Sequence, residues 1–106
     1  MFENILPIGS VVKLKDSKQL LMIITRFPIV TFNGKDGYFD YGGCFYPQGF
    51  YNNQHFFFNY EDIGEICFYG YKSNDELKFL SDIEKDLQNI DYHHFTMAEL
   101  SSDNVK

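Results

Sequence analysis

The sequence predicts an α+β fold: a small curved antiparallel sheet or open barrel of about five strands, with one C-terminal helix packed on it. Aromatic residues make up 19% of the 106 residues, as twelve Phe and eight Tyr, and such rings favour a pleated sheet. Turn signals recur at spacings of roughly 8–14 residues. After Tyr71 the apolar period changes from that of a strand to that of a helix. We expect one domain over residues 1–91 and a loosely ordered tail over residues 92–106.

The first two predicted strands form a hairpin. Residues 8–14 alternate in polarity, with Val12 and Leu14 on the inward face. A polar turn at residues 15–18 leads to residues 19–25, which are apolar on both faces. The second strand is therefore expected to lie in the middle of the sheet.

Proline and glycine mark the next breaks in the chain. Pro28 cannot donate a ladder hydrogen bond, so the second strand should bend or reach a sheet edge there. Residues 29–32 resume strand character and end at Asn33-Gly34, the strongest local turn signal in the sequence.

A third aromatic segment covers residues 38–49. Gly42 and Gly43 inside it indicate a bulge, a tight bend or the close approach of another group. Pro47 and Gly49 then indicate a turn, in which Gly49 is free to adopt positive φ.

Two more strongly β-prone runs follow. They cover residues 56–58 and 66–69 and are joined by a polar turn at residues 59–62. Alternation places Ile66 and Phe68 on one uncharged face of the later run, which we expect to point into the core.

A single helix is predicted over residues 74–90. Ser73 and Glu76 have the spacing of a capping box at its start. One face is apolar, and the opposite face is charged and includes Glu76. We expect the apolar face to dock on the protein's own sheet, with a partner's helix as the alternative. This stripe comprises Leu77, Leu80, Ile83, Leu87 and Ile90.

The net charge of −6 opposes binding to nucleic acid or to anionic membrane surfaces. No apolar run is long enough to cross a bilayer, and the N-terminus lacks a basic region before Pro7, so a cytoplasmic protein without membrane insertion is expected. Cys44 and Cys67 are predicted to be free buried thiols, with a disulfide as the alternative.

No set of residues indicates catalysis or cofactor binding, so we expect a protein that is not an enzyme and needs no cofactor or metal. The adjacent His93 and His94 lack further ligands for an ion. The neighbouring carboxylates Glu61 and Asp62 are more typical of a solvated or capping turn. Cys44 is better interpreted as a core thiol than as a nucleophile.

Three blocks of the sequence resemble a known family: residues 8–14 with 20–24, residues 40–49, and residues 57–63 with 68–71. The second block, Tyr-x-Gly-Cys-x-Tyr-Pro-x-Gly, is the most specific. The family comprises small acidic proteins of Gram-positive bacteria, formerly a domain of unknown function. Their genes accompany LXG-domain toxins exported by type VII secretion. The resemblance covers roughly residues 8–90.

This resemblance implies a cytosolic accessory factor that binds the helical N-terminal region of an LXG toxin and assists its targeting for export, as a chaperone or adaptor. Other small proteins of the toxin locus are further expected partners. The family offers no catalytic residues. An immunity protein that neutralises a toxin domain is the alternative function, followed by a small nucleic-acid-binding module, which the acidic composition disfavours.

The candidate binding surface lies around the Gly-Gly bend and the Pro-Gln-Gly turn. With 20 aromatic residues in this chain, some rings are expected to be exposed, and exposed Tyr and Phe are typical of protein interfaces. The predicted partner-binding residues are Tyr41, Phe45, Tyr46, Phe50 and Tyr51.

Overall fold

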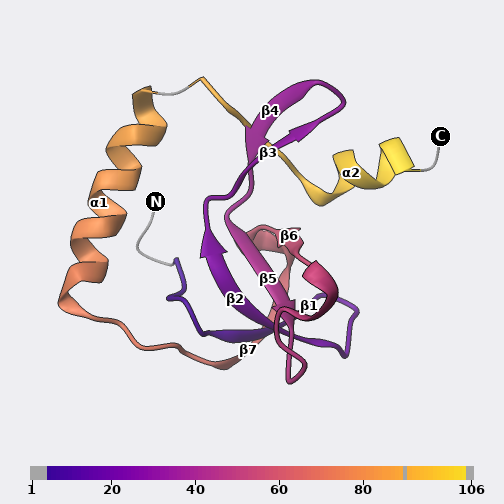
Figure 1. Ribbon diagram of the computed structural model, residues 1–106, viewed down its shortest axis with the longest axis vertical. Coiled ribbons are helices and arrows are strands. Elements are labelled where there is room, and N and C mark those ends of the chain that lie inside the picture. The colour runs from indigo at the N-terminus through magenta and orange to yellow at the C-terminus, as the bar shows by residue number, and fades with distance from the viewer. Residues whose placement is uncertain (1–4, 90, 105–106) are drawn as a thin grey trace.

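The computed structural model describes residues 5–89 and 91–104, which form two β-sheets and two α-helices (Figure 1). The five-stranded sheet has the order β6-β5-β2-β1-β7, and a smaller sheet has the order β3-β4-β8. The predicted α+β class is confirmed, and the larger sheet is curved but not closed into a barrel. The strands are β1 (Val11–Leu14), β2 (Leu20–Arg26), β3 (Ile29–Phe32), β4 (Lys35–Tyr38), β5 (Tyr41–Phe45), β6 (Phe56–Phe58), β7 (Ile63–Phe68) and β8 (His93–His94), and the helices are α1 (Asn74–Asn89) and α2 (Met97–Asn104).

The larger sheet is curled because its two edge strands are consecutive in the chain. β6 and β7 do not pair with each other; β6 pairs with β5, and β7 pairs with β1. The two edge strands are joined by Asn59 and a short 3-10 helix, η3 (Tyr60–Asp62). A chain of this length spans about 17 Å at most, so the edges of a five-stranded sheet can be connected only if the sheet curls. β2 is the central strand, as its two apolar faces predict.

A bulge in β7 reverses the exposure expected for Phe68. Val12 pairs with Ile66, whereas its neighbour Val11 pairs with Phe68, so Cys67 has no partner in β1. Directly opposed residues share a face of the sheet, and the extra residue therefore places Ile66 and Phe68 on opposite faces. Ile66 packs against the core, but Phe68 is 61% exposed. The prediction that both point inward is wrong for Phe68.

Gly42 and Gly43 provide space for two rings from β6 and the segment before it. A Cβ atom on Gly42 would collide with the His55 imidazole, and one on Gly43 would lie 3.1 Å from the Phe58 ring. The pairing of β2 with β5 is also irregular between Ile23 and Thr25. The close approach that the paired glycines indicate is therefore present, whereas the extra residue of the irregular pairing lies in β2, opposite the glycines.

The break at Pro28 moves the chain from the larger sheet to the smaller one. Phe27 adopts a φ of 56° between the end of β2 and the start of β3. β3 and β4 then form a hairpin whose two turn residues, Asn33 and Gly34, have φ values of 55° and 76°. Positive φ at both positions is the type I′ geometry that Asn-Gly favours, and the hairpin projects from the main sheet in Figure 1.

The helix α1 docks on the protein's own sheet, but its docked face differs from the predicted stripe. Leu80 is buried in the core cluster, and Ile83 and Leu87 pack against it. Leu77, in contrast, is 65% exposed. Ile90, the last residue of the predicted stripe, lies outside the described residues.

Glu76 takes the inward position on the first turn of α1. Its carboxylate accepts hydrogen bonds from the Arg26 guanidinium, Nη1 to Oε2 at 2.5 Å and Nη2 to Oε1 at 2.7 Å. Arg26 Nη1 also donates to the Leu6 carbonyl at 3.2 Å, and the guanidinium carbon lies 4.9 Å from the centre of the Phe79 ring. The side chains of Arg26 and Glu76 are only 5% and 9% exposed. The expected solvent-facing position of Glu76 is therefore wrong.

The segment after α1 is not the loosely ordered tail that the sequence predicts. β8 pairs in parallel with β4, and Phe95 is 3% exposed. The Phe95 ring centre lies 5.9 Å from that of Phe39, and the Phe95 carbonyl accepts a hydrogen bond from the buried Asn59 side chain at 2.8 Å. One buried ring and this strand pairing order the segment, and α2 then follows. Within residues 5–89 and 91–104, no helix combines the length and apolar character that crossing a bilayer requires.

Candidate protein-binding surface

The histidines near the C-terminus have structural partners. His93 Nε2 lies 2.6 Å from Glu99 Oε1, and Glu99 also accepts the Thr96 backbone N–H at 2.6 Å, which caps α2. Hydrogen bonds from Thr96 and His93 hold the pKa of Glu99 below its ordinary value. These two side chains therefore hold the entry to α2 in place.

His94 belongs to a second polar network. Its Nε2 lies 3.0 Å from both Asp40 Oδ1 and Asn59 Oδ1, and because both are acceptors, Nε2 carries the proton. Asp62 accepts the Asn59 backbone N–H at 2.8 Å, which is the capping role expected for that turn. In the part of the chain that the structure describes, no three His, Cys, Asp or Glu side chains are grouped to hold a metal ion.

The two cysteines are free and differ in exposure. Cys44 is buried, and burial raises the pKa of its thiol. Cys67, at the β7 bulge, is exposed, so the prediction of two buried thiols is wrong for this residue. His55 has an aromatic setting: its ring centre lies 4.6 Å from that of Phe57 with the ring planes tilted by 47°, and its Nε2 lies 3.5 Å from the Thr25 hydroxyl. Burial there lowers the pKa of His55.

Tyr41 is a core residue and not part of an exposed surface. It is fully buried, its ring lies 5.5 Å from that of Phe58, and its hydroxyl oxygen accepts the Leu6 backbone N–H at 3.0 Å. Tyr41 begins β5 on its inward face, so its ring joins the core. The expectation that the Tyr41 ring is exposed for partner binding is therefore wrong.

Burial of Tyr41 leads to a prediction at alkaline pH. Burial raises the pKa of Tyr41 from 10.0 to about 12. The hydrogen bond with Leu6 lowers this pKa, and the negative charge of Asp40 raises it further. The folded state keeps this proton longer than the unfolded chain, so the stabilisation is complete below pH 10.0 and is lost as the pH rises toward 12. The wild type should lose about 2–3 kcal/mol more than Tyr41→Phe over this interval. Urea unfolding of both proteins at several pH values would measure this difference in stability. Equal losses of stability in the two proteins would contradict a raised pKa of Tyr41.

The other predicted residues lie at the end of β5 and in the turn that follows it. Tyr46, Phe50 and Tyr51 are 43%, 54% and 65% exposed, whereas Phe45 is half-buried and its ring lies 4.5 Å from that of Phe56. Backbone hydrogen bonds hold this turn, from the Gly49 N–H to the Phe45 carbonyl at 2.7 Å and from the Tyr51 N–H to the Gly49 carbonyl at 2.8 Å. We call Phe45, Tyr46, Phe50 and Tyr51 the turn surface.

An apolar pocket of about 380 Å³ adjoins the turn surface. Phe45 is common to both, Phe50 contacts the pocket residue His55 edge to face at 5.9 Å, and Gln19 in the pocket wall donates to the Tyr46 carbonyl at 3.4 Å. We call it the α2 pocket because α2 forms one wall. Its lining comprises Leu14, Ser17, Gln19, Leu21, Phe45, His55, Phe56, Phe57, Met97 and Leu100.

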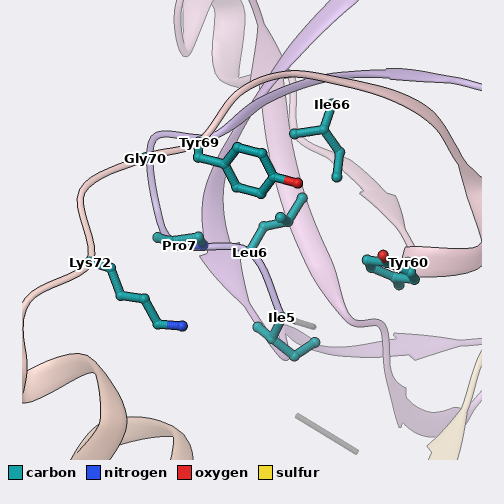
Figure 2. A pocket seen from close by; sticks show the side chains of 8 residues that line it. All are labelled: Ile5, Leu6, Pro7, Tyr60, Ile66, Tyr69, Gly70 and Lys72. Carbon is teal, nitrogen blue, oxygen red and sulfur yellow. The ribbon is translucent and has the colours of Figure 1, made fainter. Parts of the chain in front are cut away.

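A second exposed apolar group was not predicted from the sequence. Ile8, Phe68, Tyr69 and Tyr71 are 46%, 61%, 64% and 85% exposed, and we call them the β7 surface. A pocket of about 240 Å³ beside it is lined by the N-terminal segment, Tyr60 and the chain after β7. Figure 2 shows the Tyr69 ring over Leu6, with Tyr60 across the pocket. Strict alternation misplaced Phe68 in this surface because it does not register the bulge at Cys67.

Most of the chain matches a known protein family. A family model described as "Domain of unknown function (DUF4176)" matches residues 5–79, which include the whole larger sheet and the start of α1. No curated protein and no solved structure matches the chain. All residues of the turn surface lie within the matched range. This chain therefore belongs to the DUF4176 family, an uncharacterised domain family.

Proposed function

We propose that this protein is a non-enzymatic accessory factor that binds the helical N-terminal region of an LXG toxin in the cytosol and assists its targeting to type VII secretion. The three sequence blocks that resemble toxin-associated proteins motivate the choice of partner. The observation that carries a binding role is the turn surface, where three rings are exposed beside an apolar pocket.

The physical properties of the turn surface favour protein binding. Tyr and Phe rings supply large contact areas with few rotatable bonds, and such residues are frequent at interfaces. The backbone hydrogen bonds of the turn hold in place the segment that carries the rings before a partner arrives, which reduces the ordering cost of association. Because apolar burial dominates, binding should persist at moderate salt, whereas a charge-driven complex would weaken steeply.

Alanine substitutions at the turn surface test this role. In Tyr46→Ala, Phe50→Ala and Tyr51→Ala, loss of a true anchor should weaken toxin binding by more than about thirtyfold, or about 2 kcal/mol, without lowering the melting temperature. Calorimetric titration with the toxin's N-terminal region would measure the affinity. Tyr71→Ala is the matched control, because Tyr71 is also exposed but belongs to the β7 surface. Unchanged affinity in all three turn variants would exclude the turn surface as the site that binds the toxin.

A pull-down that separates the two ends of the toxin tests the function itself. The purified protein is offered the toxin's N-terminal helical region and, separately, its C-terminal domain. Capture of the N-terminal region is expected. Capture of the C-terminal domain alone would contradict the export role and favour the immunity-protein alternative.

A further inference from the structure

The α2 pocket is incompletely filled by the helix that forms its wall. α2 contributes two apolar side chains to the lining, Met97 and Leu100, which are three residues apart and so lie on one helix face. Both remain half-buried, and about 380 Å³ of space remains between α2 and the sheet. The pocket is open to solvent, so the apolar lining that Met97 and Leu100 leave uncovered is available to a further apolar group.

The strongest attachments of the C-terminal segment precede α2. Phe95 is buried, and its carbonyl accepts the Asn59 side-chain hydrogen bond at 2.8 Å. β8 pairs with β4 just before Phe95. These contacts involve no residue of α2. The link between α2 and β8 is the contact of His93 Nε2 with Glu99 Oε1 at 2.6 Å, so α2 can leave the pocket about Thr96 as the pivot, with β8 and Phe95 in place, once that contact is broken.

The pocket is suited to an amphipathic helix. It already accommodates a helix of this chain through apolar side chains at a spacing of three residues, and a longer apolar stripe would fill the remaining space. It is also continuous with the turn surface through Phe45 and through the contact between Phe50 and His55. A helix that covers the exposed rings can therefore extend into the pocket.

We propose that α2 is a displaceable helix that covers a binding site for an amphipathic helix of the partner, which takes the place of α2 in the pocket. This inference rests on the proposed function and adds the site and the conformational step. Because only molecules with α2 displaced bind the partner fully, the apparent affinity is reduced by the fraction of molecules in that state. Weakening the docking of α2 should then increase the affinity for the partner.

Hydrogen exchange on the unmodified full-length protein tests the displacement. The probe is the recombinant N-terminal helical region of an LXG toxin. When it binds, the backbone amides of α2 (Met97–Asn104) should exchange at least about tenfold faster, while those of β8 and Phe95 should not. Unchanged or slower exchange in α2 on binding would overturn the displacement and leave the proposed function intact. Absence of binding would overturn both.

A matched pair of variants tests the energetic consequence. Met97→Asp combined with Leu100→Asp places charges at the docked face of α2, whereas the control Ala98→Asp places one at an exposed position of the same helix. The double variant should bind the toxin region about three- to tenfold more tightly than wild type, and the control should bind like wild type. Binding equal to or weaker than wild type, with fast exchange in α2 of the free variant, would show that α2 does not compete with the partner.

Discussion

Replacing Arg26 by methionine is expected to lower the free energy of unfolding by about 3–5 kcal/mol, which is a large part of the stability of a domain of this size. The guanidinium holds both Glu76 carboxylate oxygens and the Leu6 carbonyl in a region almost without solvent. Methionine keeps much of the side-chain volume but leaves the Glu76 carboxylate buried without a counter-ion. Urea-induced unfolding followed by circular dichroism would give the difference.

Two further variants separate the cost of an unpaired charge from the value of the ion pair. In Arg26→Met combined with Glu76→Leu no charge is buried, so most of the lost stability should return. Lys13→Met breaks an exposed pair, in which the Lys13 and Glu65 side chains are 3.9 Å apart and 36% and 63% exposed, and it should cost less than about 1 kcal/mol. If Arg26→Met were as mild as Lys13→Met, the ion pair would not hold α1 on the sheet.

Replacing Leu80 by aspartate should destabilise the protein by a similar amount, about 3–5 kcal/mol. Leu80 is 7% exposed and is the residue of α1 that lies inside the core cluster. An aspartate there loses the apolar burial and places an uncompensated charge among aliphatic side chains. Thermal unfolding would measure the effect.

Leu77→Asp is the control for that substitution, because Leu77 lies on the same helix but is 65% exposed. It should change the stability by less than about 0.5 kcal/mol. If Leu80→Asp instead melted like wild type and lost toxin binding, the apolar face of α1 would belong to a partner interface, which is the alternative that the sequence leaves open.

Local signals predicted the elements of the fold well. The Asn-Gly turn, the central position of β2, the break at Pro28 and the extent of α1 follow from residues that are neighbours in the sequence. Each depends on backbone preference or on the period of apolar residues. The ordered structure of the segment after α1 was not predicted, because it depends on the burial of one aromatic ring, that of Phe95. A single buried ring leaves no periodic pattern in the sequence.

The candidate surface was predicted in part. Composition indicated that some of the 20 aromatic rings would be exposed, and Tyr46, Phe50 and Tyr51 are. Composition could not separate these from Tyr41, which lies in the same aromatic segment but is fully buried. The Tyr41 hydroxyl is satisfied by the Leu6 backbone N–H, 35 residues away, and a buried Tyr of this kind cannot be recognised from its own neighbours.

The sequence by itself determined the strands of the larger sheet, the position of α1, the main turns and the acidic charge, because each of these is a property of adjacent residues or of the whole composition. It did not predict β8 or α2. The tertiary structure decided which strands are neighbours, which side of β7 faces the core and which side of α1 is buried. The bulge at Cys67 reverses Phe68, and Glu76 turns inward to meet Arg26, 50 residues earlier in the chain. The physical reason is that burial is set by contacts between distant segments, which override local alternation when a bulge or a buried ion pair forms.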